Sequence, residues 1–219
     1  MQNWDRQHPR RTTHEAYLAK GMAHLRRDPV MRRLVEAYPP PEPRDHQDLF
    51  VDLIDAIISQ QLSVKAAAAI FARVEALFDG GAPAGITPAA LAAVDPEALR
   101  AAGLSRPKVG YVQGIAAAVL AGEFDPTAPA GLDDEAVVTE LVRLKGVGRW
   151  TAEMLLIFSL GRPDVFSVGD LGLRSAVARH YGVDRESHED VVAVADRWAP
   201  YRSLACHYLW KSLENEPLS

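Results

Sequence analysis

The sequence predicts an all-α fold, and three observations support that prediction. Apolar residues recur at the helical period along most of the chain, as they do in residues 48–63. Several of these segments begin with a capping residue followed by proline, for example Thr87-Pro88 and Asp95-Pro96. No segment alternates apolar and polar residues between hairpin turn signals, so we expect no strands.

About ten short helices follow from this pattern, after N-terminal residues that also read as helical. They are expected at residues 48–63, 63–78, 87–94, 95–102, 106–122, 133–146, 148–161, 170–182, 188–200 and 202–215. Gly80-Gly81 is the expected stop of the second of these helices. The proline-rich joint 39–43 is the best candidate for a boundary between the N-terminal helix and the central helices.

Composition describes an ordinary globular protein. The 219 residues are 48% hydrophobic and 24% charged, and one cysteine excludes both an intrachain disulfide and a four-cysteine cluster from this chain. No apolar run could cross a bilayer and the N-terminus lacks a secretory core, so we expect a cytoplasmic protein, nucleoid-associated if prokaryotic.

The net charge of −5 weakens a nucleic-acid hypothesis without excluding it, because the charge is uneven. Basic residues outnumber acidic ones in residues 1–33, where Arg6, Arg10, Arg11, Lys20, Arg26, Arg27, Arg32 and Arg33 stand against Asp5, Glu15 and Asp28.

The most informative segment is LVRLKGVGRWTAEML at residues 141–155, where two helices are joined by very few residues. Gly146 and Gly148 can adopt positive φ and allow close backbone approach. The second helix then starts near Gly148 with unpaired N–H groups, which suit an anion such as a DNA phosphate. Taken alone, the same pattern also fits a tight αα-hairpin that only packs two helices.

The pattern LxxLxGVGxWTAExxLxFxLxRxDxFxxxDLGLRxA resembles the signature of the helix-hairpin-helix, Gly/Pro-rich-loop-Asp DNA glycosylases, and most closely DNA-3-methyladenine glycosylase II. The resemblance extends to IISQQLSVKAA (57–67) and WAPYRSLACHYLW (198–210). It implies two helical subdomains with the active cleft between them. These are residues 1–45 plus 167–219, and residues 46–166 carrying the hairpin 141–155.

With this resemblance, Gly146 and Gly148 are expected to hold the DNA backbone. Arg149 and Arg174 could also contact phosphates, and the alternative for each is a solvated surface side chain. Lys145 stands where the family usually has proline and could add a phosphate contact. The resemblance further implies a monovalent cation, Na⁺ or K⁺, on the main-chain carbonyls of Val142, Leu144 and Gly146. The reaction itself requires no cofactor.

Asp170 precedes a predicted helix, so the plain interpretation is an N-cap. The resemblance makes it the catalytic carboxylate, and the two roles are compatible. Breaking an N-glycosidic bond builds positive charge on the sugar, which a nearby carboxylate stabilises while it orients the attacking water.

The resemblance also implies a pocket for a flipped base, lined by Trp150, Trp210 and Met154, with Tyr208 a weaker candidate. The alternative for each tryptophan is a core position. A related branch has a nucleophilic lysine at the position of Trp150, so this chain is expected to be monofunctional, without lyase activity. Where the family's best-known member has an aromatic residue, this chain has Met154, which suggests a more open pocket.

The segment from Gln60 to Ser63 matches the place where the family carries the wedge side chain that fills the hole left by the flipped base. Gln61 is the polar candidate and Leu62 the apolar one, and the sequence does not choose between them.

The function expected from these features is excision of 3-methyladenine and 7-methylguanine from double-stranded DNA by a monomer, without contact with a membrane. Two alternatives remain at this point: a glycosylase for another lesion, and a non-catalytic helix-hairpin-helix DNA-binding protein. The lone Cys206, in an apolar helix, is expected in the core rather than as a nucleophile.

Overall fold

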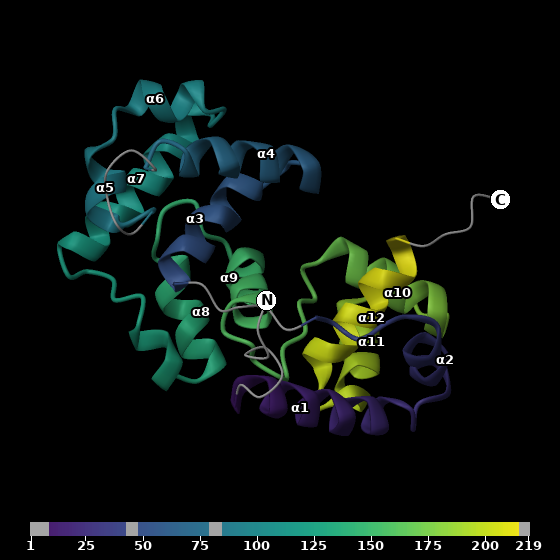
Figure 1. Cartoon of the computed structure of the whole chain (residues 1–219). Coiled ribbons are helices and arrows are strands. Elements are labelled where there is room, and N and C mark those ends of the chain that lie inside the picture. The colour runs from purple at the N-terminus through teal and green to yellow at the C-terminus, as the bar shows by residue number, and fades with distance from the viewer. Residues whose placement is uncertain (1–8, 43–47, 79–84, 215–219) are drawn as a thin grey trace, which may run out of the picture. The chain divides into compact units, whose positions relative to one another are not determined.

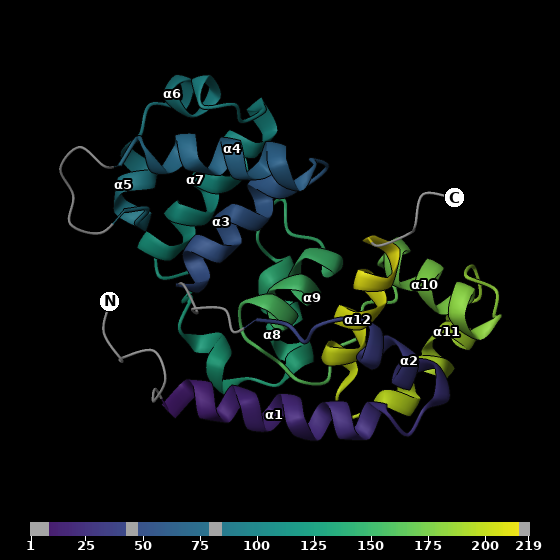
Figure 2. The ribbon, with the colours of Figure 1, turned by 45° about the vertical axis from the view of Figure 1, so that its right-hand side comes forward.

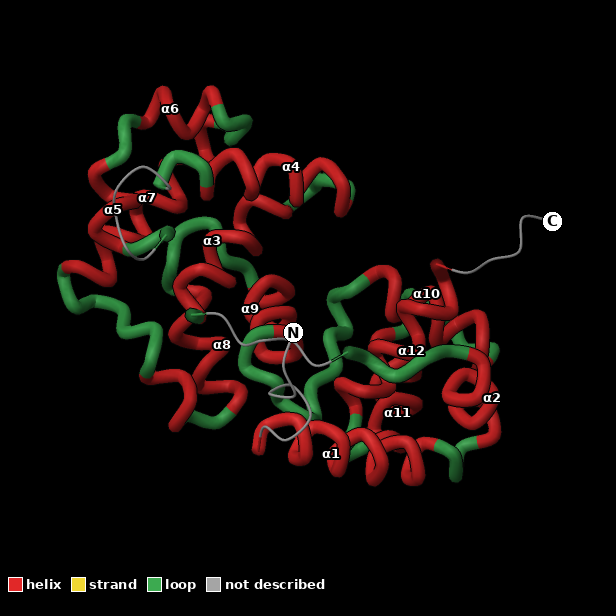
Figure 3. Tube along the Cα trace, in the orientation of Figure 1, coloured by secondary structure: helices red, strands yellow, loops and turns green. Residues whose placement is uncertain are grey.

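The chain divides into two compact helical units (Figure 1). A computed structural model describes residues 9–42, 48–78 and 85–214, and every regular element in those ranges is helical (Figure 3). Unit 1 comprises Met1–Asp45 and Gly161–Ser219, and unit 2 comprises His46–Leu160. The predicted all-α class is therefore confirmed for the described residues.

Unit 1 is built around its last helix. Its elements are α1 (Pro9–Leu25), α2 (Pro29–Ala37), α10 (Leu171–Tyr181), α11 (His188–Ala195), the short 3₁₀ helix η3 (Asp196–Trp198) and α12 (Arg202–Glu214). Helix α12 packs against α1, α2 and α10, and both ribbon views show it running beside α2 (Figure 2). Trp198, Leu209 and Cys206 are fully buried in this core, which confirms the core position expected for Cys206.

Unit 1 starts its second part at Gly161, six residues before the boundary expected at 167. The reason is a set of contacts to the start of α12. Asp164 receives hydrogen bonds from the Arg202 guanidinium at 2.9 and 3.0 Å, and Ser203 Oγ donates to the Arg162 carbonyl at 2.6 Å. These bonds join the 162–165 segment to unit 1.

Unit 2 is built around its first helix. Its elements are α3 (Leu49–Ser59), α4 (Val64–Glu75), α5 (Pro88–Ala93), α6 (Pro96–Ala101), α7 (Arg106–Leu120), the 3₁₀ helix η2 (Ala128–Gly131), α8 (Asp134–Val142) and α9 (Arg149–Phe158). Helix α3 packs against α4, α7 and α9. Phe50, Leu53 and Ile57 on α3 have no exposed surface, and burying each such side chain contributes about 1.5–3 kcal/mol.

Capping residues set the helix starts as the sequence predicts. Thr87 accepts a hydrogen bond from the Ala90 amide, and Asp95 accepts one from the Glu97 amide. Both caps are followed by proline at the first helical position. The sequence predicts these helix starts correctly because a capping residue bonds to an amide only two or three residues further along the chain.

Helix ends differ more from the expectations. Helix α4 ends at Glu75, and the stop expected at Gly80-Gly81 lies outside the described residues, as does the end of the proline-rich joint from Pro43. The expected helix 188–200 is shorter: α11 ends at Ala195, and a cis Ala199-Pro200 bond follows the 3₁₀ turn. Within the described ranges, no helix is long and apolar enough to cross a membrane.

Candidate functional site

The hairpin joins α8 to α9 through a turn in which Gly146 is sterically required. Gly146 has φ of +94°, a conformation that L-residues with side chains rarely adopt. A Cβ at this position would lie 2.5 Å from Cδ2 of Tyr111 on α7. The amide of buried Val147 donates to the Leu144 carbonyl at 3.0 Å and completes the turn. Gly146 therefore serves the packing of the hairpin.

Gly148 has a different role, because it is the N-cap of α9 and provides no side chain to cap that helix. Every other α-helix from α2 to α11 has an Asp, Ser or Thr side chain that accepts a hydrogen bond from its first turn. A Cβ on Gly148 would meet no atom within 4 Å. The start of α9 is thus open to an external acceptor, as an anion site requires.

Arg149, expected to contact a phosphate, is held by carboxylates instead. Its guanidinium makes two hydrogen bonds to Glu135 on α8, at 2.9 and 2.8 Å, and one to Glu153 on α9 at 2.9 Å. The bonds from Arg149 lower the pKa of Glu135, and Glu135 in turn raises the pKa of Arg149. Arg149 therefore links the two hairpin helices, and its contact with a DNA phosphate stays a prediction.

The turn between α3 and α4 presents both wedge candidates to solvent. Gln61 has φ of +59° and is the one residue other than glycine with positive φ in the described part of the chain. Leu62 is 40% exposed. Both side chains are available at the surface of unit 2, as a wedge requires.

The same turn is tied to the hairpin through a residue that sequence reasoning missed. The Gln60 Nε2 group donates to the Gly146 carbonyl at 3.0 Å and to Thr151 Oγ1 at 3.3 Å. Beneath the turn, Lys108 Nζ donates to the carbonyls of Ile58 and Gln60, at 2.7 Å each. No local sequence pattern marks Lys108, because its partners lie about 50 residues away.

The carbonyls expected to hold a monovalent cation lie at the C-terminal end of α8 and in the turn that follows. The Leu144 carbonyl accepts from Val147, and the Gly146 carbonyl accepts from Gln60. Each carbonyl oxygen has a second lone pair, and the negative end of the α8 dipole favours a cation. The residues therefore fit such an ion, at positions shared with existing hydrogen bonds. Among the described side chains, no group of three His, Cys, Asp or Glu could hold a metal.

Asp170 lies in unit 1 as the N-cap of α10, which confirms its predicted capping role. Its Oδ1 accepts a hydrogen bond from the Leu173 amide at 2.7 Å. The same oxygen accepts one from Nε1 of Trp210 on α12 at 3.1 Å. A Cβ on Gly172 would lie 3.1 Å from this oxygen, so the glycine leaves room for it. Two donors thus fix the orientation of the Asp170 carboxylate.

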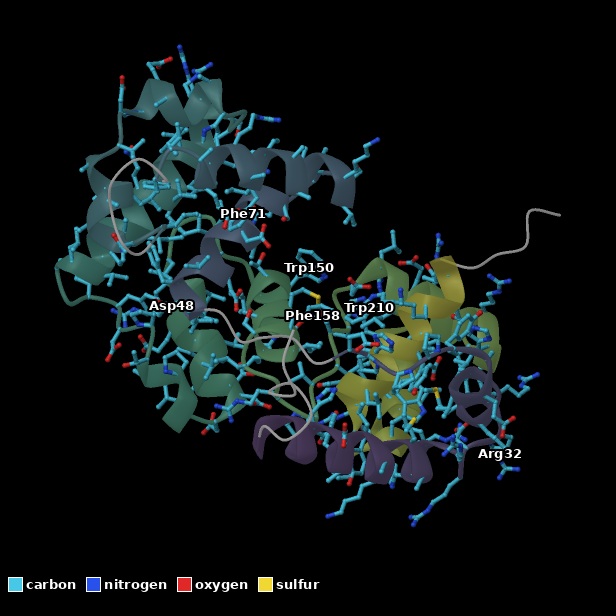
Figure 4. All side chains as sticks on the ribbon, viewed as in Figure 1. Arg32, Asp48, Phe71, Trp150, Phe158 and Trp210 are labelled. Atoms are coloured by element: carbon cyan, nitrogen blue, oxygen red, sulfur yellow. The ribbon has the colours of Figure 1, made fainter. Side chains whose placement is uncertain are left out.

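The two tryptophans proposed for the base pocket lie in different units (Figure 4). Trp150, in the first turn of α9, is 44% exposed, so it is not a core residue of unit 2. Trp210 is half-buried beside the core of unit 1 and directs its N–H to Asp170. Exposed indole surface on Trp150 is available to stack on a base.

The other two pocket candidates differ in exposure. Met154 on α9 is half-buried. Tyr208 is fully buried in the core of unit 1, because it lies on the inner face of α12. A ring with no exposed surface cannot contact a ligand, so we withdraw Tyr208 from the set of base-contacting residues. Burial also raises the pKa of Cys206, which is unsuited to act as a nucleophile.

Comparison with known families finds one match that covers most of the chain. A model of the HhH-GPD superfamily of base excision DNA repair proteins matches residues 54–200. This range includes the turn after α3, the whole hairpin and Asp170, and it ends before α12.

Curated relatives are named as DNA glycosylases. DNA-3-methyladenine glycosylase 1 of Schizosaccharomyces pombe is 36% identical over 182 residues, which cover 82% of this chain and 79% of that protein. DNA-3-methyladenine glycosylase 2 of Escherichia coli is 32% identical over 176 residues, covering 74% of this chain and 57% of that protein.

Solved structures give the same result. The 3-methyladenine DNA glycosylase Mag1 of S. pombe, in complex with abasic DNA, aligns with a TM-score of 0.79 and 33% identity over 90% of this chain and 97% of that one. A DNA-3-methyladenine glycosidase from Bacillus halodurans aligns with a TM-score of 0.72 and 38% identity over 86% of each chain.

Proposed function

This chain belongs to the HhH-GPD superfamily of base excision DNA repair proteins, and from that premise we propose that it excises alkylated purines from duplex DNA. The lesions we propose are 3-methyladenine and 7-methylguanine, and the product is an abasic site. The relatives named as 3-methyladenine glycosylases support this choice of substrate. The observation that carries the proposal is the Asp170 carboxylate, oriented by the Leu173 amide and the Trp210 indole.

Asp170 is proposed to stabilise the sugar as the base leaves. Cleavage of an N-glycosidic bond passes through an oxocarbenium-like state, and a fixed carboxylate lowers its energy. The same carboxylate orients the water that attacks the anomeric carbon. A methylated purine is already cationic and departs as a neutral base, so no separate general acid is needed.

Base excision is proposed to stop at the abasic site. A lyase step requires an amine that forms a Schiff base with the sugar. Trp150 occupies the position where the lyase branch of the superfamily has its lysine. An indole cannot form that bond, and this supports a monofunctional enzyme.

Trp150 and Trp210 are each proposed to contact the damaged base through the indole ring. A cationic base is attracted to the face of an indole, and such a contact contributes about 0.5–2 kcal/mol. The exposure of Trp150 supports this role for its ring. For Trp210 the hydrogen bond to Asp170 adds a second role, the positioning of the carboxylate.

The hairpin is proposed to hold the DNA backbone. The uncapped start of α9 at Gly148 can accept a phosphate, since helix dipole and amide donors both favour negative charge. A Na⁺ or K⁺ ion on the carbonyls of Val142, Leu144 and Gly146 would add positive charge beside that phosphate. The carbonyl positions support this proposal without requiring any side chain.

The test is incubation of the protein with duplexes that each contain one lesion: 3-methyladenine, 7-methylguanine, 1,N6-ethenoadenine, uracil or 8-oxoguanine. Free base is measured by chromatography, and strand breaks are measured with and without alkali. We expect release of both methylated purines, and strand breaks only after alkali. Release of uracil or 8-oxoguanine alone would replace the substrate assignment, and binding without any release would favour a DNA-binding protein. Breaks without alkali would contradict the monofunctional mechanism.

A further inference from the structure

Lys108, in the first turn of α7, caps the end of another helix. Its Nζ donates hydrogen bonds of 2.7 Å to the carbonyls of Ile58 and Gln60, where α3 ends. The last carbonyls of a helix lack partners within the helix and form the negative end of its dipole. A lysine that donates to two of these carbonyls gives them hydrogen-bond partners and places a positive charge at the negative end of the dipole.

The turn that Lys108 holds has a strained backbone. Gln61 adopts φ of +59°, which costs a residue with a side chain about 1–3 kcal/mol, so this conformation persists only where the surroundings fix it. A pocket lies under the turn, lined by Gln61, Leu62, Ile70 and Lys108 among others. The hydrogen bonds from Lys108 to the carbonyls of Ile58 and Gln60 therefore restrain a turn whose backbone is strained.

The turn is also joined to the hairpin. Gln60 uses its carbonyl to accept from Lys108, and it uses its side-chain amide to donate to Gly146 and Thr151. Lys108, Gln60 and the hairpin all belong to unit 2. The distance between the turn and the start of α9 is therefore set within one compact unit.

We propose that Lys108 is a positioning residue that presents the Gln60–Leu62 turn to the DNA helix at a fixed distance from the hairpin. This inference rests on the proposed function and on the expectation that this turn carries the wedge side chain that fills the space left by a flipped base. Lys108 acts through the turn and not on the DNA, because its ammonium group is already directed at two carbonyls. A turn held in place before binding loses less entropy when it enters the base stack.

The test compares Lys108→Met with Lys65→Met. Lys65 is exposed in the first turn of α4, so its variant removes the same charge from the next helix without touching the α3 carbonyls. Each protein is bound to a duplex that carries a tetrahydrofuran abasic analogue beside 2-aminopurine, whose fluorescence rises when it unstacks. We expect Lys108→Met to lose most of the fluorescence rise at saturating protein, while Lys65→Met keeps it.

Excision rates provide a second readout that a general loss of stability would not reproduce. Under single-turnover conditions we expect Lys108→Met to slow release of a 7-methylguanine paired with cytosine about tenfold, as expected for about 1.4 kcal/mol lost in flipping. The same lesion opposite a mismatched base is easier to flip and should be affected less. Lys108→Arg, which can also donate to two carbonyls, should restore most of the rate.

Several outcomes would overturn the inference. They are an unchanged fluorescence rise in Lys108→Met, an equal effect in Lys65→Met, or an equal slowing of matched and mismatched substrates. If Lys108→Met does not fold, Lys108→Gln replaces it, since that variant also removes the ammonium group that donates to the two carbonyls and keeps a polar side chain. Because fluorescence reports insertion without base release, a wild-type protein that inserts but releases no base would contradict the proposed function and not the role of Lys108.

Discussion

The starts of α9 and α10 differ in one feature that separates their functions. Helix α10 begins with Asp170, whose side chain caps the helix and accepts a bond from Trp210. Helix α9 begins with Gly148, which has no side chain and leaves the first turn open to an external acceptor. The start of α10 supplies a negative charge, and the start of α9 is suited to bind one. We therefore propose that unit 1 carries the chemistry and unit 2 binds the DNA backbone.

The largest effect is expected from Asp170→Asn. Asparagine caps a helix about as well as aspartate, so stability should change by less than about 0.5 kcal/mol. Loss of the negative charge should slow single-turnover base release on the order of 10²-fold or more, by analogy with other losses of transition-state electrostatics. Asp95→Asn, at the exposed N-cap of α6, is the matched control and should leave release unchanged. Full activity in Asp170→Asn would end its catalytic assignment.

The two hairpin glycines should separate folding from binding. Gly146→Ala forces a side chain into positive φ and against Tyr111, so we expect a loss of about 3 kcal/mol in unfolding free energy, measured with urea. Gly148→Ala has room for its Cβ and should cost less than about 1 kcal/mol.

Gly148→Ala should nevertheless weaken binding to abasic DNA about tenfold, because a methyl group would stand at the phosphate position. Fluorescence anisotropy measures this affinity. Equal binding by Gly148→Ala and wild type would remove the start of α9 from the DNA contact.

Trp210→Phe sharpens the role of the donor next to Asp170. Phenylalanine keeps an aromatic ring and removes the Nε1 hydrogen bond to Oδ1. We expect single-turnover release to fall about tenfold, as for the loss of one hydrogen bond to a charged group at the lower end of the usual range of about 1.5–3 kcal/mol. Affinity for abasic DNA should change little. A fall in affinity with an unchanged rate would instead assign Trp210 to DNA binding alone.

The smallest effect is expected from Arg149→Gln, which tests whether that residue links the hairpin helices or contacts a DNA phosphate. Its partners Glu135 and Glu153 are both acidic, so the variant should reduce stability slightly and DNA affinity less than Gly148→Ala does. Hydrogen bonds from Arg149 lower the pKa of Glu135. The stabilisation that this pair gives is therefore fully present above the pKa of a free glutamate, and it is lost as the pH falls through the lowered pKa. Urea unfolding at pH 3 to 6 should show this dependence in wild type and a weaker one in the variant. A loss of affinity larger than that of Gly148→Ala would show that Arg149 contacts a phosphate.

Local signals explain how much of the molecule the sequence could predict. The structure confirms the predicted helix starts at Thr87, Asp95 and Asp170 and the predicted glycine turn of the hairpin. Each of these features depends on contacts between residues only a few positions apart. The family resemblance, drawn from the hairpin and Asp170, is confirmed by the match over residues 54–200.

Contacts between distant residues explain what could not be predicted. Glu135 meets Arg149 across 14 residues, and Gln60 meets Gly146 across 86. The second part of unit 1 begins at Gly161 and not at the predicted residue 167, because Asp164 bonds to Arg202, 38 residues away. Tyr208 was misassigned because a helical period alone does not tell which face of α12 meets the core.

The most direct test of this division places Asp170→Asn and Gly148→Ala in one experiment, with abasic-DNA affinity and single-turnover release at saturating enzyme measured for both. We predict that Asp170→Asn keeps its affinity and loses release, while Gly148→Ala loses affinity and keeps release once bound. A parallel loss of both quantities in either variant would contradict the separation of chemistry from backbone binding.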